Sequence, residues 1–436
     1  MLQKFFTHQM ILSMIANSTP RFTKFMALVF AAMLIMVLPS CHDEVSSSYT
    51  YRVMMPVYLE MSTIRSKDIV VAPPQDLENP GKIYIYDNYL FVNEPQKGIH
   101  ILDNSNPANP INVNFIKIDG NVDLAINSNI LYADSYVDLL AFDISNVRDI
   151  KLENRVEDVF RHLYSNHDTG VIITYKDTVL TADSNRMWHW GRPWVAFDMQ
   201  SSAAYSAAPG AQSYGQGGSM ARFTLMNAHL YAVDDYSLRV FDVVEPKLPK
   251  HLKNIELGWG IETIFPFQNK LFIGSNTGMH IYDASNPSNP NKLAVYQHIL
   301  ACDPVVVNEQ FAFVTLRTGQ TCNGVNELHV VDIQNPSNPK LVKSYPMLHP
   351  HGLSLSGRHL YVAEGRHGLK SFDVADVMVI DQNQLEFLQS MKSVDIIAGP
   401  KSLIVIGPDG VCQFDYSTPS VLKPLSCIQV KNPVVV

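Results

Sequence analysis

Polar side chains stand at the starts of several short apolar strands in this 436-residue sequence, and they are the residues best suited to chemistry. The group comprises Asp123, Arg222, Glu262, Asp303, His351 and Asp395. Carboxylates and an imidazole around one opening can bind a metal ion or transfer protons. However, the 15 histidines are spread along the chain, and no HxxxH spacing occurs. We therefore expect no metal and no cofactor, and interpret the group as a hydrated polar ring with no assigned catalytic residue.

The four tryptophans suggest recognition by stacking. Trp188, Trp190 and Trp194 lie in one segment, and Trp259 stands apart. Exposed Trp and Tyr side chains favour sugar rings, peptides and protein partners. The alternative is a small cap in which the clustered tryptophans form their own core, and the sequence leaves both interpretations open.

An apolar strand that ends in Asp recurs along the chain and must position these groups. Its seven copies end at Asp103, Asp143, Asp242, Asp283, Asp332, Asp373 and Asp415. The steps between them are 40, 99, 41, 49, 41 and 42 residues, so the second interval holds an insertion. Four short strands fit into each unit of roughly 40 residues, which is typical of β-propeller blades. At the end of a third strand, Asp can accept backbone N–H bonds and a following Pro ends the ladder, so all seven are interpreted as structural.

The turn after the Asp is most regular in three copies, which begin at Asp103, Asp283 and Asp332. The last two read Asp-Ala-Ser-Asn-Pro-Ser-Asn-Pro and Asp-Ile-Gln-Asn-Pro-Ser-Asn-Pro. This pattern resembles the LVIVD-repeat family of bacterial β-propeller proteins over about residues 81–430. The resemblance implies an exported propeller and brings no catalytic motif. We expect an all-β fold, a single seven-bladed β-propeller of four-stranded blades, preceded by a signal peptide and a short tether.

A propeller blade sorts its loops onto two faces. The strands run outward from the central channel in the order A to D, so the A–B and C–D turns share one face. The B–C and D–A loops share the other. The seven Asp residues are expected on the first face, and the polar strand starts and all four tryptophans on the second.

The predicted insertion at 161–219 joins the second and third blades through a D–A connection. Its Gly-rich stretch at 210–218 follows no strand and precedes no helix. A phosphate-binding loop lies between a strand and a helix, so this stretch is not interpreted as one. We interpret it as a mobile linker.

The N-terminus has the pattern of an export signal. Arg21 and Lys24 precede an apolar run at 25–38, which is short for a membrane span but typical of a signal peptide. The run ends in Leu-Pro-Ser-Cys41, which resembles the bacterial lipoprotein signal and implies lipidation of Cys41. We predict a signal peptide at 1–40, with a start at Met14 as an alternative. The expected location is the bacterial cell envelope, on the outer membrane, facing either the periplasm or the cell surface.

Residues 41–80 are predicted to form a tether and an N-terminal strand. The strand reads YTYRVMMPVYL at 49–59. The last blade is a candidate partner for it, although 421–430 already supplies that blade with a fourth strand.

Four cysteines beyond Cys41 allow two pairs. Cys302 and Cys322 fall on the D–A face of blade five, and Cys412 and Cys427 fall on neighbouring strands of blade seven. Each pair is a candidate disulfide in an exported protein, and reduced buried thiols are the alternative.

Composition limits the classes of partner. Lys+Arg 33 against Asp+Glu 41 gives a net charge of −8, which argues against nucleic-acid binding. We expect a recognition or scaffold module for a glycan, a peptide or a protein, attached to the membrane by its lipid anchor alone. One alternative is an enzyme, a hydrolase or lyase that uses carboxylates and histidines at the channel mouth, and another is a structural envelope protein.

Overall fold

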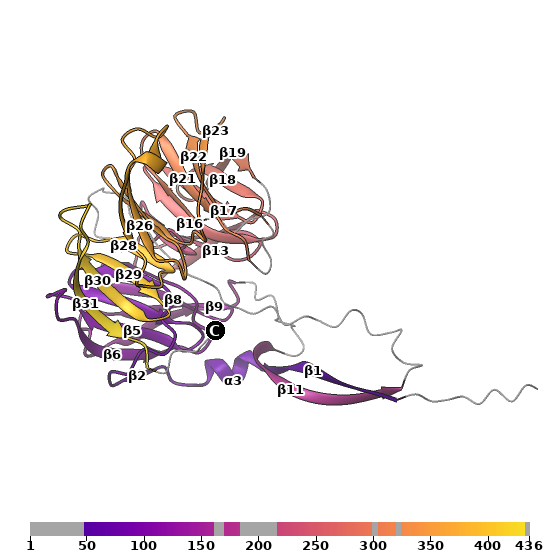
Figure 1. The fold of residues 1–436 in the computed structure, drawn as a ribbon. Helices are drawn as coiled ribbons and strands as arrows, with labels where there is room; N and C mark the ends of the chain where they lie inside the picture. Colours follow the sequence, from indigo (N-terminus) through magenta and orange to yellow (C-terminus); the bar gives the residue numbers. More distant parts are fainter. Residues whose placement is uncertain (1–47, 161–169, 184–215, 299–303, 320–323, 432–436) are drawn as a thin grey trace, which may run out of the picture. The chain divides into compact units, whose positions relative to one another are not determined.

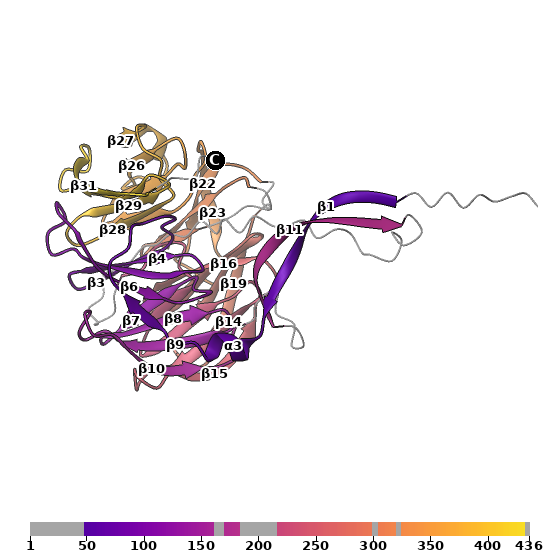
Figure 2. The same cartoon turned by 90° about the horizontal axis from the view of Figure 1, so that it is seen from below.

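Seven antiparallel sheets follow one another along the chain in the computed structural model, which describes residues 48–160, 170–183, 216–298, 304–319 and 324–431. The first strand of each sheet contacts the first strand of the next, so these strands line a common axis. The protein is therefore all-β, a seven-bladed propeller of four-stranded blades, as the repeat predicts (Figures 1 and 2).

The strands of the first three blades have the following bounds. Blade one comprises β3 (Ile83–Tyr86), β4 (Tyr89–Glu94), β5 (Gly98–Asp103) and β6 (Ile111–Lys117), with β2 (Val70–Ala72) as a fifth strand paired to β6. Blade two comprises β7 (Leu124–Asn127), β8 (Ile130–Ser135), β9 (Asp138–Asp143) and β10 (Lys151–Val156). Blade three comprises β12 (Phe223–Met226), β13 (His229–Val233), β14 (Ser237–Asp242) and β15 (Lys250–Glu256).

The remaining four blades repeat the pattern. Blade four comprises β16 (Ile261–Phe267), β17 (Lys270–Ser275), β18 (Gly278–Asp283) and β19 (Asn291–Gln297). Blade five comprises β20 (Val305–Val307), β21 (Phe311–Leu316), β22 (Glu327–Asp332) and β23 (Lys340–Pro346). Blade six comprises β24 (Leu353–Ser356), β25 (His359–Ala363), β26 (Leu369–Asp373) and β27 (Gln384–Leu388), with the 3-10 turn η2 (Ile380–Gln382) before its last strand. Blade seven comprises β28 (Asp395–Ala398), β29 (Leu403–Gly407), β30 (Gly410–Asp415) and β31 (Lys423–Gln429).

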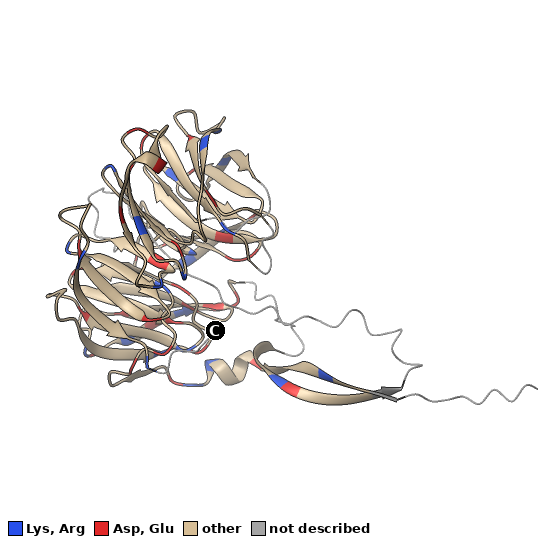
Figure 3. Cartoon of the chain, in the orientation of Figure 1, with Lys and Arg blue, Asp and Glu red and all other residues tan. Residues whose placement is uncertain are grey.

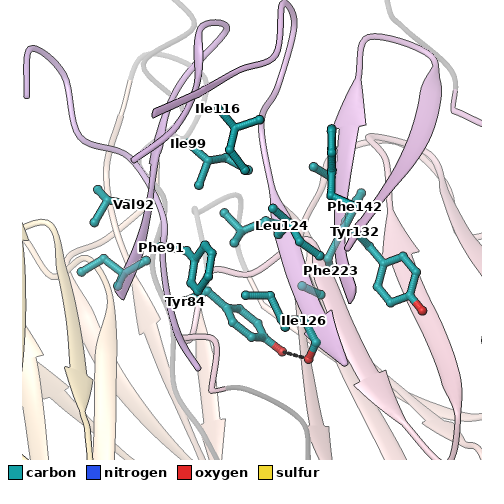
Figure 4. Packing of buried hydrophobic residues seen from close by; sticks show 14 of the residues in the cluster. Tyr84, Phe91, Val92, Ile99, Ile116, Leu124, Ile126, Tyr132, Phe142 and Phe223 are labelled. Atoms are coloured by element: carbon teal, nitrogen blue, oxygen red, sulfur yellow. Dashed lines mark hydrogen bonds between the residues drawn. The ribbon is translucent and has the colours of Figure 1, made fainter. Parts of the chain in front are cut away.

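The hydrophobic core lies between the blades. Phe91 of blade one, Ile126 of blade two and Phe223 of blade three belong to one buried cluster, and the Tyr84 hydroxyl donates to the Ile126 carbonyl at 3.5 Å (Figure 4). Both faces of an inner strand are covered, so β8 is buried at every position. Each large side chain so buried contributes about 1.5–3 kcal/mol. This packing explains why only 17% of the sequence is charged.

The ring closes without exchange of a strand, because blades one and seven each take their four strands from consecutive residues. At the seam, the buried amides of Asn104 and Gln413 exchange two hydrogen bonds of 2.7 and 3.1 Å. Ile397 and Ile404 of blade seven join the same apolar cluster as Leu90 of blade one. Packing and paired amides therefore hold the seam.

The N-terminal strand has a different partner from the one considered above. It forms β1 (Ser48–Leu59), which pairs with β11 (Val171–Asp183) of the insertion as a two-stranded sheet. Of the partners left open by the sequence, the last blade is therefore not the one that β1 takes. The 13-residue β11 matches the 12-residue β1 in length, whereas the outermost strand of blade seven has only 7 residues.

A short helix, α3 (Met61–Arg65), follows β1 and binds blade two. Arg65 donates to both carboxylate oxygens of Asp138, at 2.9 and 2.6 Å. Ile64 belongs to a small apolar cluster with Tyr136 of the blade-two B–C loop and Val171 of β11. No helix in the described ranges has the length and apolarity needed to cross a membrane.

The chain divides into two compact units. Among the described residues, 48–55 and 177–183 belong to the smaller unit, and we call them the distal ribbon. The propeller, α3 and the rest of β1 and β11 belong to the larger unit.

Candidate functional site

The polar residues predicted at the strand starts gather at one end of the innermost strands. Asp123 and Arg222 directly precede β7 and β12, Asp395 and Glu262 occupy the first and second positions of β28 and β16, and His351 lies two residues before β24. We call this end the D–A mouth. Asp303 lies outside the described residues.

The central channel is occupied by the chain itself, at the end of the insertion. Gln216 exchanges two backbone hydrogen bonds with Ile85 of blade one, at 2.6 and 2.8 Å. Its Nε2 atom donates to the carbonyl of Ala398 in blade seven at 3.1 Å. Both partners lie near the ends of their strands that face away from the D–A mouth.

From Gln216 onward, the same segment runs toward the D–A mouth. Ser219 Oγ accepts the amide of Leu353 in blade six at 3.0 Å, and the Ala221 carbonyl accepts the amide of Ile264 in blade four at 2.7 Å. A segment that bonds the innermost strands of four blades must lie between them. The interpretation of 210–218 as a mobile linker is wrong for its described part, 216–218.

On one side of the mouth the carboxylates have structural roles. Asp123 Oδ2 accepts Lys82 Nζ at 3.1 Å and the amides of Arg222 and Phe223 at 2.5 and 3.1 Å, so it links three blades. Burial lowers the pKa of Lys82 despite this carboxylate. Burial also raises the pKa of Asp134, to about 6, although backbone amides donate to it.

On the other side, two histidines stand in contact. His349 Nε2 lies 3.1 Å from the Thr318 carbonyl and must donate to it, and His349 Nδ1 lies 3.0 Å from His351 Nε2. The pKa of each is lowered, first by burial and then by charges that include Arg317. A neutral His349 then accepts from His351 Nε2, which leaves the buried His351 Nδ1 as a lone-pair nitrogen without a partner among the described residues.

A buried ion pair positions these histidines. Glu364 accepts Lys370 Nζ at 2.6 Å and also accepts the amides of Leu348 and His349, at 3.0 and 2.7 Å. A Cβ at Gly365 would lie 2.9 Å from His351 Nε2, so this close approach requires glycine. The sequence pattern did not identify Glu364 or Lys370 as positioning residues.

A second charged group faces the mouth from blades three and four. Arg222 Nη2 donates to Asp235 Oδ1 at 2.5 Å. Burial raises the pKa of Glu262 to about 7; Arg317 and Arg222 lower it, and Asp235 raises it. The described charges of the chain are mixed in sign over the blades (Figure 3). Acidic and basic side chains are likewise mixed in this group at the mouth.

Trp259 stands on an anchored turn beside this group. Trp259 is 55% exposed. The amides of Gly260 and Ile261 donate to the Asp235 carbonyl at 2.9 and 3.2 Å, and the amide of Gly258 donates to that of Tyr236 at 3.2 Å. Gly258 and Gly260 have φ of 102° and 86°, which other residues rarely adopt. These bonds therefore fix the backbone that carries the exposed Trp259, next to Asp235 and three residues before Glu262. We call Trp259, Arg222, Asp235 and Glu262 the Trp259 platform.

The other predicted stacking residues, Trp188, Trp190 and Trp194, lie outside the described residues, as do Cys41, Cys302 and Cys322. Cys412 and Cys427 are cross-strand partners of β30 and β31, and a disulfide joins them.

The seven repeat carboxylates all make the same local bond. Each accepts the amide two residues further on, at 2.8–2.9 Å: Asp103, Asp143, Asp242, Asp283, Asp332, Asp373 and Asp415. These bonds close the C–D turns on the face away from the D–A mouth.

A recurrent acid–base pair on the D–A face was not predicted from the sequence. An acid at the end of the second strand meets a base near the start of the third in three blades: Glu94 with His100, Asp234 with Arg239, and Glu364 with Lys370. The acid and the base are five or six residues apart at the same position of each of these blades, and this spacing could have predicted the pairs. Among the described residues, no group of three or more His, Cys, Asp or Glu is placed to hold a metal ion.

Comparison with known proteins supports the repeat and the fold. The LVIVD repeat family matches residues 80–115, 269–297 and 301–346, which are the three copies with the complete turn. The chain therefore carries LVIVD repeats. Among curated proteins, none matches significantly.

Several solved structures are similar to this chain at low sequence identity. Sqt1 from Saccharomyces cerevisiae is 10% identical, with a TM-score of 0.50 over 87% of this chain and 90% of that one. BamB from Moraxella catarrhalis is 7% identical, with a TM-score of 0.44 over 83% of this chain and 96% of that one. The computationally designed Ika8 protein is 10% identical, with a TM-score of 0.49 over 83% and 92%. At such identities the similarity to Sqt1 shows the fold alone.

Proposed function

We propose that this seven-bladed propeller with LVIVD repeats is a recognition module that binds a glycan, a peptide or a protein through its D–A/B–C loop face. The observation that carries the proposal is Trp259, which is 55% exposed on a turn fixed by backbone hydrogen bonds. Trp is among the residue types that are enriched in binding hot spots.

The surroundings of Trp259 favour a ligand with both flat and polar parts. The indole offers a stacking surface, while Arg222 and Glu262 offer hydrogen-bond donors and acceptors at the mouth. Leu348, 47% exposed beside His349, adds an apolar contact on the blade-six side. Sugar rings and peptides with polar substituents combine these features.

The filled channel supports a surface role. Because 216–222 bonds the innermost strands, a ligand of the D–A mouth meets Arg222 and Glu262 from outside and does not pass through the ring. Binding at a rigid loop face is the usual way in which a scaffold of this kind acquires function.

We further propose that Cys41 is lipidated and that the protein acts in the bacterial envelope, on the outer membrane. The support is the apolar run at 25–38 followed by Leu-Pro-Ser-Cys41. Cys41→Ala should move the protein from the membrane fraction to the soluble fraction. Unchanged membrane retention of that variant would contradict the anchor.

The binding proposal is tested by glycan arrays and envelope pull-downs with wild type, Trp259→Ala and Trp188→Ala. Leu248→Ala is the matched control, because Leu248 is 52% exposed on the C–D turn of blade three, on the opposite face. We expect ligands that Leu248→Ala retains and Trp259→Ala loses. Equal retention by all three variants would overturn the proposed face, and a screen without any ligand would favour a structural envelope protein.

A hydrolase or lyase is the second candidate. It is favoured by the neutral His349–His351 pair, by Arg317, and by the Glu262 pKa of about 7. Among the described residues, no carboxylate is hydrogen-bonded to either imidazole. Turnover in a substrate screen that Glu262→Gln abolishes, with ligand binding retained, would support this candidate over recognition alone.

A further inference from the structure

The distal ribbon carries exposed apolar side chains on both of its strands. In β1, Tyr51, Met54 and Met55 are 42%, 44% and 39% exposed, and in β11 Val179 is 57% exposed. Side chains of alternate parity in β1 point to opposite faces, so Met54 and Met55 place apolar surface on both sides.

Nothing within this sheet covers that surface, because the sheet has two strands. Among the described residues, this two-stranded ribbon has no second layer to bury its faces, and its outer edges pair with no further strand. Two polar pairs lie within the ribbon: Arg52 lies 3.6 Å from Asp177, and the hydroxyls of Thr50 and Thr181 are 3.1 Å apart. The distal ribbon thus presents apolar side chains together with few charges, one Arg and two Asp.

The position of the ribbon in the chain indicates what covers it. Cys41 lies seven residues before Ser48, where β1 begins. Seven extended residues span at most about 25 Å. If Cys41 is lipidated, as proposed above, the start of the distal ribbon at Ser48 is therefore held within that distance of the bilayer surface.

We propose that the distal ribbon is a membrane-contact element, and that Tyr51, Met54, Met55 and Val179 enter the interface of the bilayer to which Cys41 is anchored. Tyr favours the interface because its ring is apolar and its hydroxyl is polar. Arg52 can keep its guanidinium at the headgroups while its methylenes lie deeper. The ribbon then adds a second contact beside the lipid and fixes how the chain leaves the membrane.

The test uses full-length protein in vesicles of phosphatidylethanolamine and phosphatidylglycerol doped with a lipid that carries a diazirine on its acyl chain. After illumination, mass spectrometry locates the lipid adducts. We expect adducts on peptides that cover 48–55 and 177–183 at five or more times the level on the C–D turn of blade three. That turn is the control, because its Val244 is 71% exposed and hence equally available to a non-specific probe.

A double variant, Met54→Ser with Val179→Ser, should lose most of the ribbon adducts while the protein stays in the membrane fraction through Cys41. Ribbon peptides labelled no more than the blade-three turn, in protein that is membrane-bound, would overturn the proposal and leave the anchor intact. Protein cross-links between ribbons of two copies, without lipid adducts, would overturn it in favour of self-association. Failure of the anchor is scored separately, by the membrane retention of Cys41→Ala.

Discussion

Asp235 holds Arg222 through its side chain, with Oδ1 2.5 Å from Nη2, and supports the turn of Trp259 through its main-chain carbonyl. One residue of the blade-three B–C loop therefore connects the exposed indole to the charged groups of the mouth. The loop is itself fixed by the neighbouring Asp234–Arg239 pair, at 2.7 Å. Two successive carboxylates with different partners thus support the Trp259 platform: Asp235 belongs to it, and Asp234 fixes its loop.

Asp235→Ala should lower the pKa of Glu262, because the negative charge of Asp235 is among the causes that raise it. The variant also loses the Arg222 ion pair, which should cost about 1–2 kcal/mol of unfolding free energy. Selective carboxyl-carbon NMR titration measures the first effect and urea denaturation the second. Asp409→Ala, in an exposed pair 3.9 Å from Lys392, is the control and should change neither. A Glu262 titration that is the same in Asp235→Ala as in wild type would contradict the platform.

Glu262 makes stability depend on pH in a defined direction. Its pKa rises from an ordinary value of 4.5 to about 7, so the folded protein holds a proton that the unfolded chain releases between these values. Its contribution to stability therefore falls as pH rises from 4.5 to 7 and then levels off. Relative to wild type, the unfolding free energy of Glu262→Gln should rise by about 1–2 kcal/mol as pH increases from 5 to 8. This is less than the full pKa shift implies, because the carboxyl is partly exposed. If wild type and Glu262→Gln lost stability in parallel at all pH values, the raised pKa of this carboxyl would be contradicted.

The disulfide of blade seven should stabilise the seam blade. Cys412 and Cys427 are 15 residues apart, and closing a loop of that length contributes about 3 kcal/mol. The double variant Cys412→Ser with Cys427→Ser should unfold at correspondingly lower urea concentration. Dithiothreitol should then have less effect on the variant than on wild type. Equal stability of the two proteins would mean that the bond adds nothing to blade seven.

The C–D carboxylates predict loss of stability in acid. Hydrogen bonds from Ser285, first from its hydroxyl and then from its amide, hold the pKa of Asp283 below its ordinary 3.8. Such a group stabilises the fold above that value, and its contribution is lost as pH falls through the depressed pKa. The same direction applies to Asp103, Asp143, Asp373 and Asp415. Asp283→Asn should lower the melting temperature at pH 7 and flatten its fall toward pH 3, whereas an unchanged acid slope would contradict this role.

The repeat made the propeller predictable from sequence. A carboxylate at the end of every third strand recurs because its bond is local: Asp283 binds the amide of Ser285, two residues away. Local bonds leave a local pattern. The four strands of a blade follow from it, since each hairpin partner is the next segment of the chain.

The features that sequence missed depend on distant contacts. The pairing of β1 with β11 joins segments more than 100 residues apart, and either strand alone fits several partners. Gln216 binds Ile85 of blade one and Ala398 of blade seven. A Gly-rich sequence gives no indication of such contacts. Glu364 positions His349 through a backbone amide, and backbone partners leave no residue-type signal.

Ligand recognition through the Trp259 platform can be tested by one comparison of affinities. For the strongest ligand from the screen, isothermal titration calorimetry gives the dissociation constants of wild type, Trp259→Ala and Leu248→Ala. Loss of a stacked indole at a binding centre costs about 2 kcal/mol, or roughly 30-fold in affinity. We expect that loss in Trp259→Ala and wild-type affinity in Leu248→Ala. Equal affinities in all three proteins would contradict the account.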